Sequence, residues 1–386
     1  MRIAHVTDVY LPRLGGIELQ VRDLAGRQRA AGHDPIVLTT TDGPRPPGGA
    51  ERPGALDEPP VLRLGRQART VGFGPYRAMH DRALRASLAA QRVEAVHVHV
   101  SAFSPLGWTA ARVAAAEGLP TVVSVHSMWH DIVPLVRRYA RWHAAAAWPV
   151  AWAAVSSAAA GAVRAALDGA PVAVLPNGID PEDWMTPGRR PAGNVPTLIS
   201  VMRMVRRKRP RELLRTLLAL QRGHPGRFRA VLVGDGPLLP GLRRDLAAAG
   251  PGTGIRLTGA LDRTSIRTVL ARSDLYLAPA PRESFGIAAL EARSAGLPVI
   301  ARAGSGVADF IQDGVEGWLV HSGSDLRATI AALLDDPARL AAVAHHNRAV
   351  APRVHWQAVL ETADALYAAA AARHSGRLGQ LLGSPA

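Results

Sequence analysis

The chain has 386 residues, enough for two or three domains of ordinary size. Charged residues make up 20% of it and hydrophobic residues 48%, a balance that excludes a disordered or collagen-like chain. It contains no cysteine, which excludes disulfides, iron–sulfur clusters, thiolate zinc sites and a cysteine nucleophile. The 46 basic residues outnumber the 31 acidic ones, giving a net charge of +15.

The positive charge comes almost entirely from arginine, because Lys208 is the only lysine. This preference, together with abundant alanine, glycine and proline, is typical of GC-rich codon usage. It explains the basic balance without a nucleic-acid partner, and we expect none. Lys208 lies between Arg207 and Arg209, so the chain has no Gly-Lys-Ser/Thr phosphate loop.

Two segments of the sequence bear on where the protein is located in the cell. The first residues lead directly into an apolar, strand-like run, so we expect no signal peptide. Residues 144–163 carry no charge and have the length of a membrane span, but they are mostly alanine and include Pro149. A buried strand followed by a small-residue helix fits them better. We expect a cytoplasmic protein whose contact with the inner face of the membrane, if it has one, is peripheral.

Short apolar runs alternate with amphipathic stretches along the whole chain. This alternation is typical of βαβ units and predicts parallel, doubly wound sheets. Strands are predicted at residues 2–7, 35–40, 61–64, 95–100, 121–125, 151–155, 172–175, 197–201, 229–233, 254–258, 275–278, 298–301 and 317–320. Helices are predicted at 18–31, 76–91, 106–117, 157–167 and 354–373, with further helices between the later strands.

A polar segment rich in proline and glycine, 176–196, separates the two series of strands and marks a domain boundary. We therefore predict one Rossmann-like domain over 1–180, a second over 190–350, and a C-terminal helix and tail over 351–386. The similar stretch 41–60 lies between two strands of the first domain and is interpreted as a long surface loop.

Ligands of parallel sheets bind beyond the carboxyl ends of the strands, so the loops there are the candidates. The first strand leads into Gly15-Gly16 at a helix start, which permits close approach of an anion but is also a common turn. Gly234-Asp235-Gly236 and Gly304-Ser305-Gly306 both lack the third glycine of a dinucleotide fingerprint, which argues against an NAD-dependent enzyme. No metal-binding motif is present, and we expect no metal and no cofactor.

Two cations follow the strand at 197–201. Arg203 and Lys208 together form a reasonable clamp for a diphosphate. The alternative is a solvated basic run, because Arg206, Arg207 and Arg209 are neighbours. A chain that uses arginine everywhere else keeps its one lysine here, which favours the clamp.

The densest signal follows the strand at 275–278. Ser284 is expected to cap a helix whose free N–H groups face a phosphate. Glu283 lies in the loop before this helix, and Glu291 lies within it, at about 8–10 Å from its start. That distance matches the separation of a diphosphate from its ribose hydroxyls, although either glutamate alone is an ordinary helix-start acid.

Glu283 and Glu291, in Glu-Ser-Phe-Gly-Ile-Ala-Ala-Leu-Glu, resemble the E-x7-E motif of retaining glycosyltransferases of the GT-B fold, family 4. The resemblance continues through residues 292–301 and 313–320, and elsewhere through Gly15-Gly16, 175–180, the Arg203/Lys208 spacing and 232–237. It covers essentially the whole chain. It implies two doubly wound Rossmann-like α/β domains facing across a cleft, the first on the acceptor side and the second binding the nucleotide sugar. The C-terminal helix would pack back toward the first domain.

The resemblance also implies roles for matching residues. Gly16 would offer its amide to the donor phosphate or to the acceptor, and His126 would contact the donor sugar. Arg203 and Lys208 would neutralise the leaving diphosphate, and Glu283 would hold sugar hydroxyls. Glu291 would bind the ribose, and the donor-binding set is completed by Ser284, Phe285, Gly286, Ile287 and Gly234, of which 285–287 offer backbone amides. Met202, Arg209-Pro210 and 304–309 depart from the family pattern, chiefly around the donor sugar.

Some aromatic residues stay open between two interpretations. His97 and His99 alternate on one strand, so they are either satisfied core histidines or one of them enters the cleft. Trp129, Trp142, Trp148 and Trp152 gather in the first domain, where they serve packing or contact an apolar acceptor or a membrane.

The leading hypothesis is a retaining, metal-independent glycosyltransferase that moves a hexose-type sugar from a nucleotide-diphosphate donor, UDP-linked, to a hydroxyl of a small-molecule, glycan or lipid-linked acceptor. Two alternatives remain. One is a nucleotide-sugar epimerase or hydrolase on the same fold. The other is a basic protein that binds nucleic acid or an anionic membrane and has a degenerate site, which the charge of +15 motivates.

Overall fold

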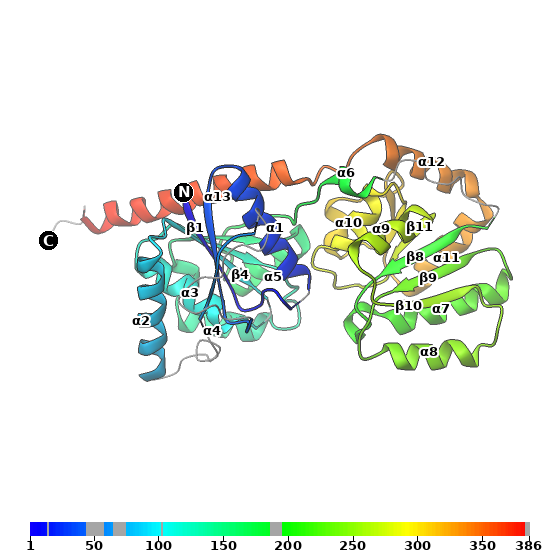
Figure 1. Cartoon of the computed structure of the whole chain (residues 1–386), viewed down its shortest axis with the longest axis horizontal. Helices are drawn as coiled ribbons and strands as arrows, with labels where there is room; N and C mark the ends of the chain where they lie inside the picture. Colours follow the sequence, from blue (N-terminus) through cyan, green and yellow to red (C-terminus); the bar gives the residue numbers. More distant parts are fainter. Residues whose placement is uncertain (14, 44–57, 65–74, 102, 186–194, 383–386) are drawn as a thin grey trace. The chain divides into compact units, whose positions relative to one another are not determined.

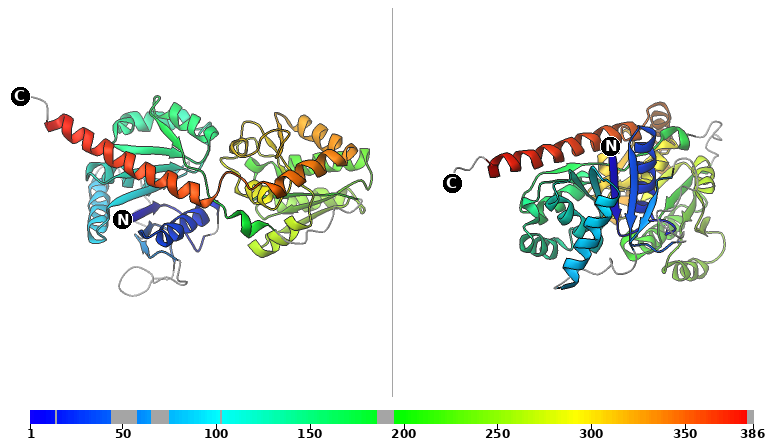
Figure 2. Two further views of the ribbon diagram at one scale, coloured as in Figure 1. Left: turned by 90° about the horizontal axis from the view of Figure 1, so that it is seen from above. Right: turned by 60° about the vertical axis from the view of Figure 1, so that its left-hand side comes forward.

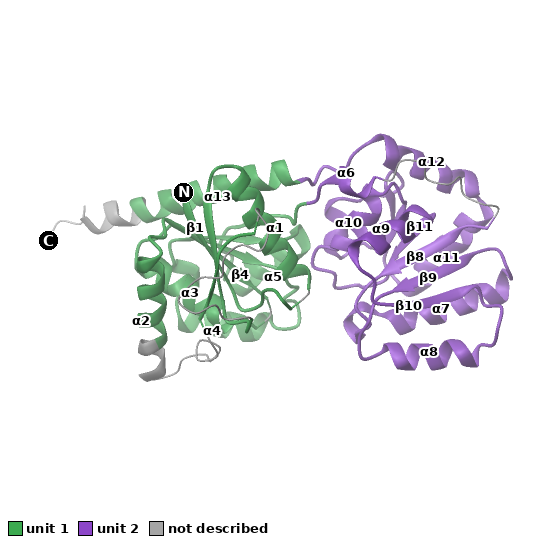
Figure 3. Cartoon of the chain, in the orientation of Figure 1, with its two compact units in different colours: residues 1–178, 356–386 green, residues 179–355 purple. Residues whose placement is uncertain are grey.

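The computed structural model describes residues 1–386 except 14, 44–57, 65–74, 102, 186–194 and 383–386 (Figure 1). The chain divides into two compact units, coloured separately in Figure 3. Unit 1 consists of residues 1–178 and 356–386, and unit 2 of residues 179–355. The second crossing between them returns the C-terminal segment to unit 1.

The elements of unit 1 are β1 (Arg2–Thr7), α1 (Gly16–Ala30), β2 (Asp34–Thr39), β3 (Val61–Arg63), α2 (Pro75–Ala90), β4 (Ala95–Val100), α3 (Pro105–Ala116), β5 (Thr121–Val125), α4 (Val133–Trp142), η2 (Ala145–Ala147), β6 (Val150–Ala154), α5 (Ser157–Ala166), β7 (Val172–Val174) and α13 (Trp356–Leu382). The seven strands form one parallel sheet in the order β3-β2-β1-β4-β5-β6-β7. Strands β4, β5 and β6 are buried along their whole length, as expected of a sheet covered on both faces.

Helix α13, red in Figure 2, lies along unit 1 and packs on one face of its sheet. Its apolar side is formed by small and large residues in alternation, among them Val359, Ala363, Tyr367 and Ala370. They pack against Leu24 of α1 and against buried strand residues such as Ala95, Val122 and Ala151. The predicted C-terminal helix that packs on the first domain is therefore confirmed.

The elements of unit 2 are α6 (Pro181–Trp184), β8 (Thr197–Val201), η3 (Arg206–Lys208), α7 (Pro210–Gly223), β9 (Arg229–Val233), α8 (Leu239–Ala248), β10 (Ile255–Gly259), α9 (Arg263–Ala271), β11 (Leu275–Ala278), α10 (Ile287–Ser294), β12 (Val299–Arg302), η4 (Gly306–Asp309), β13 (Gly317–Val320), α11 (Gly323–Asp335) and α12 (Pro337–Ala349). Six parallel strands run in the order β10-β9-β8-β11-β12-β13. Leucine-rich α7 and α11 supply much of the core on one face.

The predicted strands are all present, with ends that differ by at most one residue. The uncharged stretch 144–163 folds into η2, β6 and α5, as the alanine content favours. Among the described residues, no helix combines the length and apolarity needed to cross a membrane. Most of the expected loop at 41–60 lies outside the described residues.

Candidate active site

The switch point of the unit 2 sheet gathers most of the predicted donor-binding residues. Strands β8 and β11 are neighbours in the sheet, yet β8 connects toward β9 on one side and β11 toward β12 on the other. Doubly wound sheets bind ligands at the carboxyl ends of such a strand pair. Arg203 and Lys208 follow β8, and Glu283 follows β11, so the predicted clamp and the first glutamate flank this point.

Lys208 and Glu283 form an ion pair across the switch point. The Nζ of Lys208 donates to Oε2 of Glu283, although 75 residues separate them in sequence. Both side chains are largely buried, with 21% and 17% exposed. The main-chain oxygen of Glu283 accepts from the amide of Gly306 at 2.8 Å, which fixes the loop to η4. Arg203 is exposed.

The start of α10 differs from the prediction. Ser284 does not cap the helix: α10 begins at Ile287, and Gly286 is its N-cap in the left-handed region at φ 92°. A Cβ at Gly286 would lie 2.5 Å from Cγ2 of Val307, so this turn needs glycine. Phe285 is buried, its ring centroid 5.3 Å from that of Phe310. The amides of Ile287 and Ala288, the first two of α10, precede the first hydrogen bond of the helix and can reach an anion, whereas those of Ala289 and Leu290 already donate to the main-chain oxygen of Gly286.

Glu291 is the fifth residue of α10 and lies about 6 Å along the axis from its first residue, closer than predicted because the helix starts later. Its side chain is half-buried. Burial raises the pKa of its carboxyl to about 8, opposed by the positive charge of Arg263. Arg263 itself lies 3.3 Å from Asp183 and 5.1 Å above the centre of the Trp184 ring.

The amide of Gly234 stabilises the loop after β9 and is not available to a phosphate. Its N–H donates to the main-chain oxygen of Gly259 at 2.8 Å. At φ 131°, a Cβ would lie 1.9 Å from the main-chain oxygen of Met202. The loops after β8 and β9 therefore cross so closely that only glycine fits, and the amide of Gly234 is already committed.

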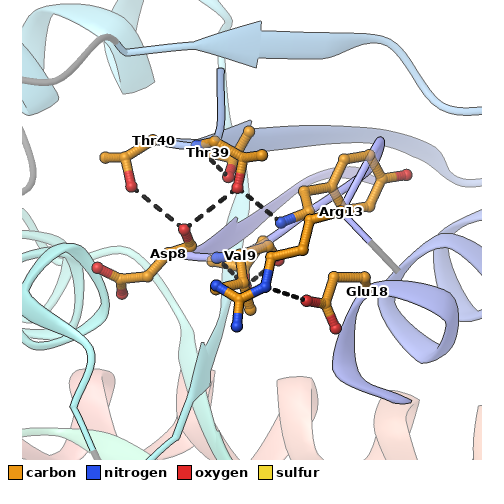
Figure 4. Close-up of polar contacts among 9 residues, drawn as sticks. Asp8, Val9, Arg13, Glu18, Thr39 and Thr40 are labelled. Atoms are coloured by element: carbon orange, nitrogen blue, oxygen red, sulfur yellow. Dashed lines mark hydrogen bonds and ion pairs between the residues drawn. The ribbon is translucent and has the colours of Figure 1, made fainter. Parts of the chain in front are cut away.

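In unit 1, two helix starts at the carboxyl edge of the sheet are occupied by carboxylates. Gly16 opens α1 and is exposed, and the buried Glu18 folds back so far that a Cβ at Gly15 would lie 2.3 Å from its Oε2. Arg13 forms an ion pair with Glu18 (Figure 4), in which Nε of Arg13 lies 3.3 Å from Oε1 of Glu18. Glu18 thus supplies negative charge where the sequence predicts an external anion beside Gly16.

Asp8, which no sequence motif marks, lies directly after β1 and beside the start of α3. Its two carboxylate oxygens each accept an amide hydrogen bond at 3.0 Å from the first turn of α3, from Leu106 and Gly107. Its main-chain oxygen accepts from Thr40 at 3.2 Å (Figure 4). Burial raises the pKa of the carboxyl to about 6 despite these bonds. An aspartate directly after a strand, with a proline-initiated helix after a neighbouring strand, was the available signal.

His126 follows β5, is half-buried, and contacts a cluster of buried histidines. Its Nε2 lies 3.0 Å from Nδ1 of His99, and burial lowers its pKa to about 4. His97 and His99 are both buried on β4, and burial also lowers their pKa well below the ordinary value. His97 bonds to Ser124 and Tyr367 and is a satisfied core histidine. His99 is equally buried but contacts His126 directly.

Ring nitrogens of His5, His97 and His99 lie within 4.8 Å of one another, the one grouping with metal-ligand spacing among the residues described. Their rings are stacked, with centroids 4.3–5.4 Å apart. The nitrogens of His97 contact Tyr367 and Ser124, and those of His5 contact His99 and Gln28. This arrangement is that of a hydrogen-bonded cluster, in which the lone pairs are already used.

The tryptophans divide between the two interpretations. Trp129 and Trp152 are buried and, with Trp148, surround the ring of Trp108 at centroid distances of 5.8–6.3 Å. These three serve packing. Trp142, at the end of α4, is 82% exposed and belongs to the surface.

Comparison with known proteins agrees with this geometry. The model for "Glycosyltransferase Family 4" matches residues 14–183, and that for "Glycosyl transferases group 1" matches 187–349. A glycogen synthase of Mycobacterium tuberculosis is 30% identical over 207 residues, which are 52% of this chain and 49% of that protein. D-inositol 3-phosphate glycosyltransferase 2 of Catenulispora acidiphila is 27% identical over 91% of this chain and 89% of its own.

Solved structures show the fold. Anabaena HepE, determined in complex with UDP and glucose, superposes with a TM-score of 0.72 at 19% identity, over 94% of this chain and 98% of that one. The matched region spans about half the length of the glycogen synthase. The two family models together cover most of unit 1, apart from its first 13 residues and α13, and nearly all of unit 2. The chain therefore belongs to the group 1, family 4 glycosyltransferases and has the GT-B fold.

Proposed function

We propose that this protein is a retaining glycosyltransferase that moves a hexose-type sugar from a UDP-linked donor to a hydroxyl acceptor without a metal ion. The observation that carries the proposal is the Lys208–Glu283 pair at the switch point of unit 2, with Glu291 on the adjoining helix. A nucleoside diphosphate needs a cation for its phosphates and a carboxylate for its ribose hydroxyls, and this unit offers both.

The chemistry assigned to Lys208 follows from its three N–H donors. One of these N–H groups donates to Glu283, which leaves two for the oxygens of a diphosphate. Arg203 and the first amides of α10 add further positive potential. Because negative charge grows on the diphosphate as the glycosidic bond breaks, this cluster stabilises the transition state more than the ground state.

Glu283 is held by Lys208 through one oxygen, which leaves its other oxygen to accept hydrogen bonds from sugar hydroxyls. Glu291 accepts hydrogen bonds from the ribose hydroxyls through both oxygens of its carboxylate, which a glutamine cannot reproduce because its amide nitrogen only donates. In unit 1 the proposal assigns the side chain of His126 to the donor sugar, whereas the carboxylate of Glu18 beside Gly15 disfavours a donor phosphate at the amide of Gly16 and leaves that amide to the acceptor. Attack on the same face as the departing diphosphate, which acts as the base, retains the anomeric configuration and needs no protein nucleophile.

A thermal-shift panel with UDP, GDP, ADP and TDP tests the donor class. A ligand at 100 times its dissociation constant stabilises by about 2.7 kcal/mol. We expect UDP alone to shift the wild type, Glu291→Ala and Lys208→Ala to lose the shift, and Arg207→Ala to keep it. Arg207 is the matched control because it is an exposed cation adjacent to Lys208. A shift with another nucleotide would overturn the UDP assignment.

The reaction is tested by following UDP-sugar consumption with and without a panel of hydroxyl acceptors. Transfer predicts a product whose anomeric coupling constant matches that of the donor. Inversion would overturn the retaining mechanism, and donor loss to free sugar or an epimer without any acceptor would favour the alternative enzymes. Activity that survives prolonged EDTA treatment supports metal independence, whereas loss restored by Mg²⁺ contradicts it.

A peripheral contact with anionic lipid is favoured by helix α4. Its exposed face carries Leu135 and Trp142, 63% and 82% exposed, together with Arg138 and with Arg141, which is paired with Asp168. Apolar side chains between arginines fit the interface of an anionic bilayer. We expect sedimentation with vesicles containing phosphatidylglycerol but not with pure phosphatidylcholine. The double variant Leu135→Ser, Trp142→Ser should lose it, whereas binding unchanged by these substitutions would refute the contact.

A further inference from the structure

The buried histidines of unit 1 form a continuous hydrogen-bonded chain that ends at His126. His5 on β1 stands in register with His97 on β4, and His99 lies two residues farther along the same strand. Alternate residues of a strand share a face, so the three rings lie on the same side of the sheet. Gln28 of α1 and Tyr367 of α13 cover that side and are themselves buried.

The amide of Gln28 sets the direction of this chain. Its Nε2 donates to the hydroxyl oxygen of Tyr367 at 2.9 Å, which leaves Oε1 facing Nε2 of His5 at 2.6 Å. A carbonyl oxygen only accepts, so Nε2 of His5 carries a proton and donates it. Burial lowers the pKa of His5 to about 4, so the ring is neutral and its Nδ1 bears a lone pair.

Each following bond is then determined. Nδ1 of His5 accepts at 3.0 Å from Nε2 of His99, which must carry the proton. The neutral His99 ring therefore accepts through Nδ1, at 3.0 Å, from Nε2 of His126. In His126 the proton is thus on Nε2, and Nδ1 is left as an acceptor.

The branch through Tyr367 is consistent with the same direction. Its hydroxyl accepts from Gln28 and so donates its own proton to Nδ1 of His97, 2.8 Å away. Nε2 of His97 then donates to the Ser124 hydroxyl at 2.8 Å. Reversing the Gln28 amide would reverse both branches at once, because every member between the two ends, His126 and Ser124, has one bond in each direction.

We propose that Gln28 is a positioning residue that acts through His5 and His99 to hold His126 as the Nε2-protonated tautomer, so that Nδ1 of His126 accepts a hydrogen bond from a hydroxyl of the bound donor sugar. The assignment of the sugar as the ligand rests on the proposed function. The tautomer itself depends only on the contacts within unit 1. A sugar hydroxyl is the fitting partner because it donates, whereas a phosphate oxygen does not.

The tautomers are tested directly by magic-angle-spinning NMR of the full chain labelled with 15N-histidine. Signals of His126 are assigned by their loss in His126→Gln. We expect a protonated, pyrrole-type Nε2 and an unprotonated, pyridine-type Nδ1 in His126, and the same pattern in His5 and His99. A protonated Nδ1 in His126, or equal populations of both tautomers in the wild type, would overturn the proposal.

Gln28→Leu removes the amide while keeping the side chain close in size. We expect the single His126 tautomer to become a mixture and kcat to fall on the order of 10-fold, as when the orienting partner of a functional histidine is removed. Affinity for UDP without its sugar should change less than 2-fold. Gln221→Leu is the matched control, since Gln221 is a buried glutamine of unit 2 with two hydrogen bonds, to Phe228 and Gly226.

The two proposals fail in different ways. If NMR shows the expected tautomers but no nucleotide sugar binds, the proposed function falls and with it the sugar contact, while the role of Gln28 in the tautomer stands. If transfer occurs but Gln28→Leu leaves both kcat and the 15N spectrum unchanged, the positioning role is refuted and the glycosyltransferase assignment is untouched. A fall in kcat with the wild-type spectrum retained would also refute it.

Discussion

Replacing Glu291 with glutamine should stabilise unit 2 and at the same time abolish its response to UDP. Burial raises the pKa of this carboxyl from 4.5 to about 8. An unfolded chain therefore binds fewer protons at residue 291 than the folded one between those values. The contribution of Glu291 to the free energy of unfolding is fully present below about pH 4.5 and is lost as pH rises toward 8.

The size of the stability change follows from the pH interval over which the folded and unfolded chains differ in protonation at residue 291. Between pH 4.5 and pH 7 the loss amounts to at most about 3 kcal/mol, at 1.36 kcal/mol per pH unit. Because the side chain is only half-buried, solvent reduces this, and we expect a gain of about 1–3 kcal/mol in Glu291→Gln at neutral pH. For a unit of this size, that raises the midpoint of thermal unfolding by roughly 2–10 °C.

Differential scanning calorimetry at pH 4.5 and 7.5, with and without UDP, measures both effects. The variant should match the wild type at pH 4.5, exceed it at pH 7.5, and show no shift with UDP. Glu182→Gln, an exposed acid of the same unit, should change neither value. If Glu291→Gln is no more stable than the wild type at pH 7.5, burial does not disfavour the ionised form of Glu291, and the explanation given for its raised pKa is wrong.

Three further outcomes are expected. His5 and His126 have pKa values near 4 in the folded chain against 6.5 ordinarily, so the unfolded chain takes up more protons and stability falls as pH drops from 6.5 to 4. Urea unfolding should show a loss of about 2 kcal/mol per independent histidine at pH 5, and a flat profile would contradict this. Tyr367→Phe should cost about 1–3 kcal/mol in the same assay, because two buried polar groups lose their partner; an unchanged midpoint would refute the bonds. Gly286→Ala should weaken UDP binding in calorimetric titration, because a Cβ meets Val307 and the positive φ is strained; wild-type affinity would show that the turn tolerates a side chain.

Much of the fold could be predicted from the sequence because its strands are buried on both faces and appear as short apolar runs. The start of α10 could not, since Ser284 is a good capping residue and only the left-handed turn at Gly286 delays the helix. Helix α4 was not predicted, although its apolar residues lie on one side of the helix and Arg137, Arg138 and Arg141 lie on the other.

The site residues, too, could be predicted only in part from the sequence. Lys208, Glu283 and Glu291 were predicted as site residues because they lie in two short segments of the sequence and match a known motif. The histidine chain was not, because its bonds depend on which strands are neighbours and in what register. His5 and His99 are 94 residues apart, and nothing in the sequence around either one indicates that their rings meet. Gln28 is still less visible, since a glutamine on a helix is ordinarily a surface residue.

Isothermal titration of UDP into the wild type, Lys208→Met and Arg207→Met tests the central claim most directly. Loss of charge-assisted bonds to the diphosphate should weaken binding by Lys208→Met about 10- to 100-fold, corresponding to roughly 1.5–3 kcal/mol. Arg207→Met should bind as the wild type does. Equal affinity in all three proteins, or equal weakening by the two substitutions, would contradict the assignment of the single lysine to a diphosphate clamp.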